Sequence, residues 1–304
     1  MSSAAQTSTA VPAADEAAAS KSAENEAAAS KPAENEAAAS KAAAVRSMFS
    51  EIAPTYDLLN TLLSFGLDSR WRAQAADAAL ASGSWRAGSV DAPQARADEG
   101  LGDVESRRFR VLDVATGTGK LAFAIKRRRE HCTVTGVDFA EPMLAVARSA
   151  ATRASLDVRF AQADGTALPF DEASFDVVTI AYGLRNFADP DAGLKEFRRV
   201  LRPGGRLVVL EFPPPRPGLF GKVFSTYFER VLPRVGGAVS GRRSAYAYLP
   251  RSVLGFLPPA VLAERMRAAG FSNVDYRLQT FGVSAMHVGL VPAAEIPGGP
   301  VSDV

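Results

Sequence analysis

Apolar runs of the length of a β-strand recur through the middle of the chain. They lie at residues 108–115, 132–139, 157–164, 175–182 and 205–212. Helical patterns separate most of these runs. Strands that alternate with helices form a parallel sheet covered on both faces. The sequence therefore predicts an α/β fold with a doubly wound, mostly parallel sheet.

The helical pattern at residues 189–201 illustrates how these helices are expected to begin and end. Asp189 is expected to cap the helix, and Pro190 stands in its first turn. The residues expected on its buried face are Leu194, Phe197, Val200 and Leu201. Pro203-Gly204-Gly205 is expected to stop the helix.

Segments on both sides of these runs extend the prediction. Runs 274–279 and 285–291 lie too close together for a helical crossover, so they are expected to form a C-terminal antiparallel strand pair. Residues 48–80 predict two amphipathic helices, with a break near Pro54. The leucines spaced for one helical face there are Leu58, Leu59, Leu62 and Leu63. Residues 82–107, rich in Gly, Ser, Asp and Arg, are expected to be a loop insertion.

Three similar ten-residue units open the chain at residues 15–44, beginning with "DEAAASKSAE". Alanine is their only apolar residue, so residues 1–44 are expected to be a disordered or partly helical tail. Function is then expected in a domain over residues 45–291, with a helical lid at 45–81. Residues 292–304 are expected to be a flexible C-terminal tail.

Composition narrows the class of protein. The 304 residues are 47% hydrophobic, enough for a buried core, and no apolar stretch reaches 18 residues. The N-terminus lacks a signal-peptide pattern, and the single cysteine, Cys132, allows no intramolecular disulfide, so a cytoplasmic protein is expected. The net charge of +2 is too small to indicate a nucleic-acid partner.

The charge is unevenly distributed. Residues 1–44 carry three lysines and six acids, and residues 214–251 carry seven basic residues against Glu229 alone. The basic residues of this segment are Arg216, Lys222, Arg230, Arg234, Arg242, Arg243 and Arg251. Mixed with Phe and Leu, they predict peripheral contact with an anionic bilayer, at the inner face of the membrane. The alternative is a lid helix that packs on the domain with its charges in solvent.

A glycine loop follows the first strand-like run. Gly117-Thr118-Gly119, with Ala122 in the third position, satisfies the pattern of dinucleotide-binding loops. A phosphate-binding P-loop is excluded, because Val114 stands five residues before Gly119 and Leu121 follows the lysine. Taken alone, this pattern leaves the ligand open.

Acids near the ends of the first three strand-like runs narrow the choice of ligand. These are Asp113, Asp138 and Asp164, and they are expected at the same edge of the sheet. Three carboxylates would repel a pyrophosphate, whereas a ligand with a sulfonium, an ammonium, ribose hydroxyls and an exocyclic amine suits them. The sequence therefore predicts S-adenosylmethionine (SAM) as the cofactor and no metal.

Each acid is given a place along this ligand. Asp138 follows Gly119 by 19 residues, the interval expected for a contact with the ribose. Asp164 and Gly165 are expected beside the adenine, and Asp113 is expected to face the methionine amine. The cofactor-binding residues predicted in this way include both glycines of the loop, Gly117 and Gly119.

Several blocks of the sequence resemble a known family. They are "MFSEIAPTYDLLNTLLSFGLDSRWR" (48–72), "VLDVATGTG" (111–119), "ALPFDEASFDVVTIAYGLRNFAD" (167–189), "EFRRVLRPGGRLVVLEF" (196–212) and "AYAYLPRSV" (245–253). Over roughly residues 45–291 the chain resembles the C-methyltransferases of menaquinone and ubiquinone biosynthesis. The resemblance implies a class I SAM-dependent methyltransferase fold. It also implies cofactor contacts at Thr118, Asp138, Asp164 and Gly165.

The same resemblance implies methylation of a ring carbon on a polyprenylated quinol. Attack on a sulfonium methyl needs an electron-rich carbon, which the reduced ring supplies once a hydroxyl loses its proton. Arg185 and Asn186, after the fourth strand-like run, are the catalytic candidates. Arginine stays protonated, so Arg185 is expected to stabilise a phenolate or to order a water. The alternative is that the pair only fixes the loop backbone.

Other residues with possible roles are weighed against packing roles. His287 lies in a strand-like run, where a core or edge histidine is the favoured interpretation. Tyr246 and Tyr248 are expected either to line an aromatic substrate pocket or to pack in the core. The sequence leaves the general base unidentified.

Some positions depart from the family pattern. Asp68 stands where relatives often have His, and Arg242-Arg243-Ser244 replaces a more acidic segment. Ala181 stands where ubiquinone-type relatives often have Ser, which favours demethylmenaquinol as the substrate. The alternatives are 2-methoxy-6-polyprenyl-1,4-benzoquinol, another small molecule, or a SAM-binding module without catalysis. The sequence is compatible with an oligomer.

Overall fold

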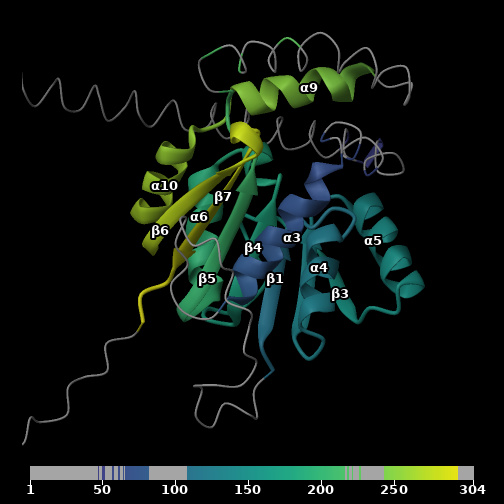
Figure 1. Cartoon of the computed structure of the whole chain (residues 1–304). Helices are drawn as coiled ribbons and strands as arrows, with labels where there is room; N and C mark the ends of the chain where they lie inside the picture. The colour runs from purple at the N-terminus through teal and green to yellow at the C-terminus, as the bar shows by residue number, and fades with distance from the viewer. Residues whose placement is uncertain are drawn as a thin grey trace, which may run out of the picture.

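One seven-stranded sheet, in the order β3-β2-β1-β4-β5-β7-β6, forms the frame of the computed structural model (Figure 1). The strands are β1 (Arg110–Val114), β2 (Thr133–Asp138), β3 (Val158–Gln162), β4 (Phe175–Ala181), β5 (Leu201–Glu211), β6 (Ser272–Gln279) and β7 (Ser284–Leu290). The helices are α3 (Leu67–Leu80), α4 (Lys120–Arg128), α5 (Glu141–Arg153), α6 (Pro190–Val200), α9 (Arg243–Leu254) and α10 (Pro259–Ala268). The structure describes residues 66–81, 108–215 and 243–293, and single residues 47, 50, 51, 57, 61, 64, 218, 221 and 226.

The pairing of the strands confirms the predicted sheet. Strands β1 to β5 pair in parallel, and β7 lies antiparallel between β5 and β6. Strand β1 pairs with β2 on one side and β4 on the other, so the order of the strands reverses at β1. In open α/β sheets, ligands bind beyond the carboxyl ends of the strands at such a reversal.

Two apolar cores, one on each face, explain why the strands read as nearly continuous apolar runs. On one face α3 and α4 pack around Trp71, together with Val111. On the other face α6 and α10 pack against a cluster that includes Leu112 and Phe197. Adjacent residues of β1 thus belong to different cores, and both are fully buried.

The helix predicted at residues 189–201 is confirmed at its start and corrected at its end. Asp189 caps α6, because its side chain accepts hydrogen bonds from the backbone N–H groups of residues 191 and 192. The helix ends at Val200, and Leu201 is already extended and begins β5. Pro203-Gly204-Gly205 lies inside β5, where the register with β4 shifts. Gly204 absorbs the extra residues with a φ of 77°.

Strand β5 and the β6–β7 turn anchor α3. Arg206 on β5 donates hydrogen bonds to the backbone carbonyls of Ala78 and Ala81 at the C-terminal end of α3. Carbonyls at a helix C-terminus lack partners within the helix and favour a cation. Trp71 Nε1 donates to Thr280 Oγ1 at 3.0 Å. These contacts fix the first half of α3 at the carboxyl ends of the strands and its C-terminal end near the start of β4.

Several predictions fall outside the described residues. They concern the repeat tail at 1–44, the first helix of 48–80, the insertion at 82–107, most of the basic segment at 214–251 and the tail beyond 293. Within the part of the chain that the structure does describe, no helix has the length and apolar character needed to cross a bilayer.

Candidate active site

The glycine loop turns sharply between β1 and α4. Gly117 and Gly119 both have positive φ, at 55° and 85°. A side chain at Gly119 would also collide with the ring of Phe123, because a Cβ there would lie 2.7 Å from Cζ. The Thr116 N–H donates to the Val137 carbonyl at 2.9 Å and thereby holds the loop against β2. The loop therefore presents backbone rather than side chains on its way into α4.

Asp138, the last residue of β2, holds the glycine loop directly. Its Oδ2 accepts from the Gly117 N–H at 2.8 Å, and its Oδ1 accepts from the Ala140 N–H at 2.9 Å. The side chain is buried, and burial raises its pKa above the usual value. The structure thus places Asp138, the residue predicted to contact the ribose, directly against the predicted cofactor loop. The contact with a ribose stays a prediction.

Asp164 and Gly165 lie just beyond the carboxyl end of β3. Asp164 is exposed, and its Oδ1 accepts from the backbone N–H and the hydroxyl of Thr166, at 2.8 and 2.7 Å. Gly165 is buried against Phe187, where an added Cβ would lie 2.4 Å from Cζ. Phe187 directly follows Asn186 in the sequence. The loop at the predicted adenine site therefore packs against the segment that carries the catalytic candidates.

Asp113 has an interior position. Its Oδ2 accepts from the Thr116 hydroxyl at 2.6 Å, and its Oδ1 accepts from the Thr179 hydroxyl at 2.7 Å. Burial raises the pKa of this carboxyl to about 6. Asp113 therefore braces the glycine loop against β4. Both oxygens of Asp113 already accept hydrogen bonds inside the protein. Its contact with a methionine amine stays a prediction.

Arg185 and Asn186 lie in a short 3₁₀ turn, η1 (Leu184–Asn186), directly after β4. Both are buried, with 7% and 8% of their surface exposed. Arg185 Nη1 and Asn186 Nδ2 both donate to the Tyr182 carbonyl. Asn186 Oδ1 accepts from the Tyr248 hydroxyl at 3.2 Å, which connects η1 to α9. The pair does fix the loop backbone, as one interpretation predicts, and this leaves a role in the reaction open.

Tyr248 and α9 lie on the side of the sheet where the site is expected. Figure 1 shows α9 crossing above the edge of the sheet to which β1 and β4 point. Burial raises the pKa of Tyr248, so its hydroxyl remains a donor at neutral pH. The side chain of Tyr246 lies outside the described residues.

Asp57 contacts the glycine loop, and the sequence did not predict this. Its Oδ1 accepts from the Thr118 hydroxyl at 2.8 Å and lies 3.2 Å from Lys120 Nζ. Asp68, buried in α3, pairs with Arg72 and lies 3.9 Å from Lys120 Nζ. The predicted helical lid thus reaches the glycine loop through carboxylates. Asp57 belongs to the "APTYDLLN" block, but nothing in the block indicates that it contacts the loop.

Glu211 is a second residue that sequence reasoning missed. It ends β5, only 1% of its surface is exposed, and its Oε2 lies 2.9 Å from Arg185 Nη1. The sequence does contain a sign of this residue, because the strand-like run at 205–212 also has an acid near its end. His287, in contrast, is buried in β7, as predicted for a core histidine. Its Nε2 lies 2.9 Å from the Pro259 carbonyl oxygen, and burial lowers its pKa to about 4.

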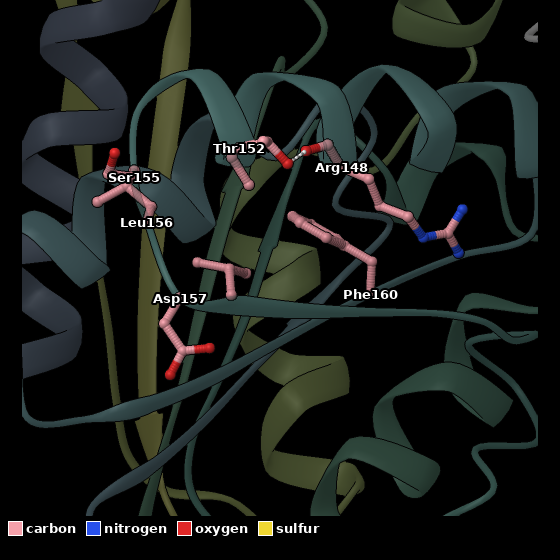
Figure 2. Close-up of a pocket in the computed structure, with 8 residues that line it drawn as sticks. Arg148, Thr152, Ser155, Leu156, Asp157 and Phe160 are labelled. Carbon is pink, nitrogen blue, oxygen red and sulfur yellow. Dashed lines mark hydrogen bonds between the residues drawn. The ribbon is translucent and has the colours of Figure 1, made fainter.

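A surface hollow of about 420 Å³ lies elsewhere on the molecule (Figure 2). It is lined by residues that include Arg148 and Thr152 of α5, with Asp157 and Phe160 below them. Asp157 precedes β3, whereas Asp164 follows it, so the hollow lies at the amino end of that strand and away from Asp164. None of the predicted site residues lines it.

The strand order, the glycine loop after β1 and the carboxylates near the ends of β1, β2 and β3 are those of the class I SAM-dependent methyltransferase fold. Solved structures support this fold. A SAM-dependent methyltransferase from Thermotoga maritima, described as a possible histamine N-methyltransferase, aligns with a TM-score of 0.51 at 17% identity. The alignment covers 80% of this chain and 99% of that one.

Sequence comparisons then give the family. The model of the ubiE/COQ5 methyltransferase family matches residues 37–291, so the chain belongs to that family, which confirms the resemblance found in the sequence. A demethylmenaquinone methyltransferase from Thermus thermophilus is 54% identical over 242 residues, covering 80% of this chain and 99% of the relative. A ubiquinone/menaquinone biosynthesis C-methyltransferase from Geobacter sulfurreducens is 43% identical over 248 residues, covering 81% and 87%.

The interior position of Asp113 makes a prediction about stability. Its pKa rises from 3.8 to about 6 on folding, so the native state holds the proton more tightly than the unfolded chain. The contribution of this group to the free energy of unfolding is full below the pKa that it has in the unfolded chain. It falls by about 3 kcal/mol as the pH rises through the pKa of the folded protein. We expect Asp113→Asn to remove this loss. Urea unfolding of both proteins between about pH 4 and pH 8 tests it, and parallel curves would contradict it.

Proposed function

We propose that this protein transfers a methyl group from SAM to a ring carbon of a polyprenylated quinol, with demethylmenaquinol as the favoured acceptor. One observation carries the proposal: the glycine loop, Asp138 and the Arg185–Asn186 turn lie together at the carboxyl edge of the sheet, at the reversal of strand order. The names of the Thermus and Geobacter relatives support a quinone precursor as the acceptor. A ubiquinone-type benzoquinol is the alternative acceptor.

The residues at this edge fit SAM by their chemistry. Gly117 and Gly119, which carry no side chains, leave room for close approach of a ligand, and Asp138 and Asp164 offer acceptors for hydroxyl and amine groups. Thr118, whose hydroxyl already donates to Asp57, would place the helical lid over the methionine end. When bound, SAM supplies an electrophilic methyl group on a sulfonium.

Arg185 and Asn186 would act on the acceptor ring. The guanidinium is paired with Glu211 and stays charged, so it stabilises an oxygen that loses its proton rather than removing that proton. The Asn186 side chain is fixed between Tyr182 and Tyr248, which holds it in one orientation. Neither residue acts as the general base in this proposal.

Positioning would contribute most of the rate. Holding two reactants in line can supply about 7–11 kcal/mol, whereas a general base of typical effect supplies roughly 3–5 kcal/mol. The hydrogen bonds that Asp113, Asp138 and Glu211 accept from neighbouring loops give the site a rigid frame of this kind.

Two variants separate the two halves of the proposed reaction. Asp138→Ala removes an acceptor for the cofactor and is expected to weaken SAM binding about tenfold to hundredfold. Arg185→Ala removes a donor to the developing phenolate, so kcat is expected to fall about 100-fold with the SAM Kd nearly unchanged. Calorimetry with SAM and mass spectrometry of methylated demethylmenaquinol measure both effects.

Each contrary outcome has its own meaning. Wild-type turnover in Arg185→Ala would remove that residue from the mechanism. SAM uptake without methylation of any quinol would favour a binding module, and a faster reaction with the benzoquinol precursor would favour the ubiquinone branch. Binding of NADH in place of SAM would contradict the proposed cofactor.

We also propose that the basic segment at 214–251 rests on an anionic bilayer, from which a lipid-tailed quinol would come. The support is the excess of seven basic residues over one acid in that segment. Vesicles with and without anionic lipid should pellet different amounts of protein, more with the anionic lipid. Equal recovery in the supernatant would rule out this contact.

A further inference from the structure

We propose that Glu211 is a positioning residue for Arg185, an inference that rests on the proposed role of Arg185 in the reaction. Glu211 is the last residue of β5, and β5 pairs directly with β4, the strand that leads into η1. The Tyr182 N–H donates to the Leu210 carbonyl at 2.7 Å, so the pairing of the two strands continues to the start of the turn. Glu211 therefore approaches η1 from the neighbouring strand.

A single carboxylate holds both the backbone and the side chain of Arg185. Glu211 Oε1 accepts from the Arg185 backbone N–H at 3.2 Å, and Oε2 accepts from Arg185 Nη1 at 2.9 Å. The Phe212 N–H also donates to Oε2, at 3.0 Å. The turn and the guanidinium are thus fixed to the same group, and neither can move without breaking a bond to it.

Stability alone does not account for this pair. Both side chains are buried, with 4% and 1% of their side-chain surface exposed, and burying two charges carries a desolvation cost that their attraction need not recover. An apolar pair of similar volume would serve packing as well. What the ion pair adds is geometry, because a planar guanidinium held by a carboxylate has a fixed orientation.

The remaining contacts of Arg185 reinforce this orientation. Its Nη1 also donates to the Tyr182 carbonyl, and its guanidinium lies 5.6 Å from the centre of the Phe212 ring. Phe212 in turn stacks on Tyr182, with ring centres 4.3 Å apart. Glu211 and its neighbour in sequence therefore enclose the guanidinium on two sides, and Glu211 supplies the only charge among these contacts.

A glutamine at position 211 would keep the size of the side chain and change its hydrogen bonding. One carboxylate oxygen would become an NH₂ group, which cannot accept from Arg185 or from the Phe212 N–H. We expect Glu211→Gln to lower kcat about 10- to 100-fold, the range seen when a group that orients a functional residue is lost. The SAM Kd is expected to stay within about twofold, because the Glu211 carboxylate accepts from Arg185 and Phe212 and, among the described residues, not from the glycine loop.

A double-mutant cycle with Arg185→Gln tests whether Glu211 acts through Arg185. If it does, Glu211→Gln lowers kcat in the wild-type protein and changes it less than about threefold in the Arg185→Gln protein. Equal reductions in both proteins would overturn the proposal. The wild-type protein is first assayed for methylation of demethylmenaquinol. A wild-type protein without this activity would contradict the proposed function, whereas the comparison of the variants tests only the role of Glu211.

Two further variants complete the test. Glu211→Asp keeps the charge and withdraws the carboxylate by one methylene, and we expect it to lower kcat at least about tenfold, because position and not charge is lost. If Glu211→Gln does not fold, this variant carries the test, and wild-type kcat in Glu211→Asp would then overturn the proposal.

Asp176→Asn is the matched control for loss of a carboxylate. Asp176 also accepts from a backbone N–H, that of Arg110 at 2.7 Å, and from an arginine side chain, Arg202. It lies near the start of β4, at the opposite end of the sheet from η1. This variant should keep the wild-type kcat. An equal loss of kcat in Asp176→Asn and Glu211→Gln would show a general loss of stability and would overturn the positioning role.

Discussion

Burying a carboxylate requires donors, and this requirement shapes the candidate active site. Asp113, Asp138 and Glu211 are each at most 6% exposed, and each satisfies its oxygens with donors from a neighbouring loop or strand. An unpaired buried charge would cost several kcal/mol, so the loops are held wherever the carboxylates place them. The acids near the strand ends therefore determine the geometry of the loops between the strands.

Strand β4 connects the two halves of the site. Thr179 in the strand donates to Asp113, which also holds Thr116 of the glycine loop. Two residues beyond its last residue, at Gly183, the chain packs on Ala115, where an added Cβ would lie 2.4 Å away. The cofactor loop and the turn that carries Arg185 thus share supports on one rigid strand. A shift in either would be resisted by both.

The sequence predicts the seven strands and most of the acids near their ends. Prediction is simplest for the inner strands, such as β1 and β4, because burial on both faces leaves nearly continuous apolar runs. The partners of those acids depend on register and could not be predicted. Nothing in the sequence indicates that Thr179 faces Asp113, or that Phe187 occupies the space beside Gly165. The Pro203-Gly204-Gly205 segment reads as a helix stop and proves to be a shift within β5, since local residues cannot show which strand continues the pairing.

In the proposed mechanism, the charge of Arg185 makes Glu211 as important as Asp113, Asp138 and Asp164. Without Glu211 the buried guanidinium would keep its contacts with the Tyr182 carbonyl and the Phe212 ring but would lose its counter-ion, and its field would extend over the acceptor side. Paired with Glu211, it is fixed in direction, and the pair carries no net charge. In the proposed reaction, a neutral quinol would then approach without strong attraction in a wrong orientation. Stabilisation would develop only as an oxygen of the ring becomes negative, which is the condition for lowering a barrier rather than tightening ground-state binding.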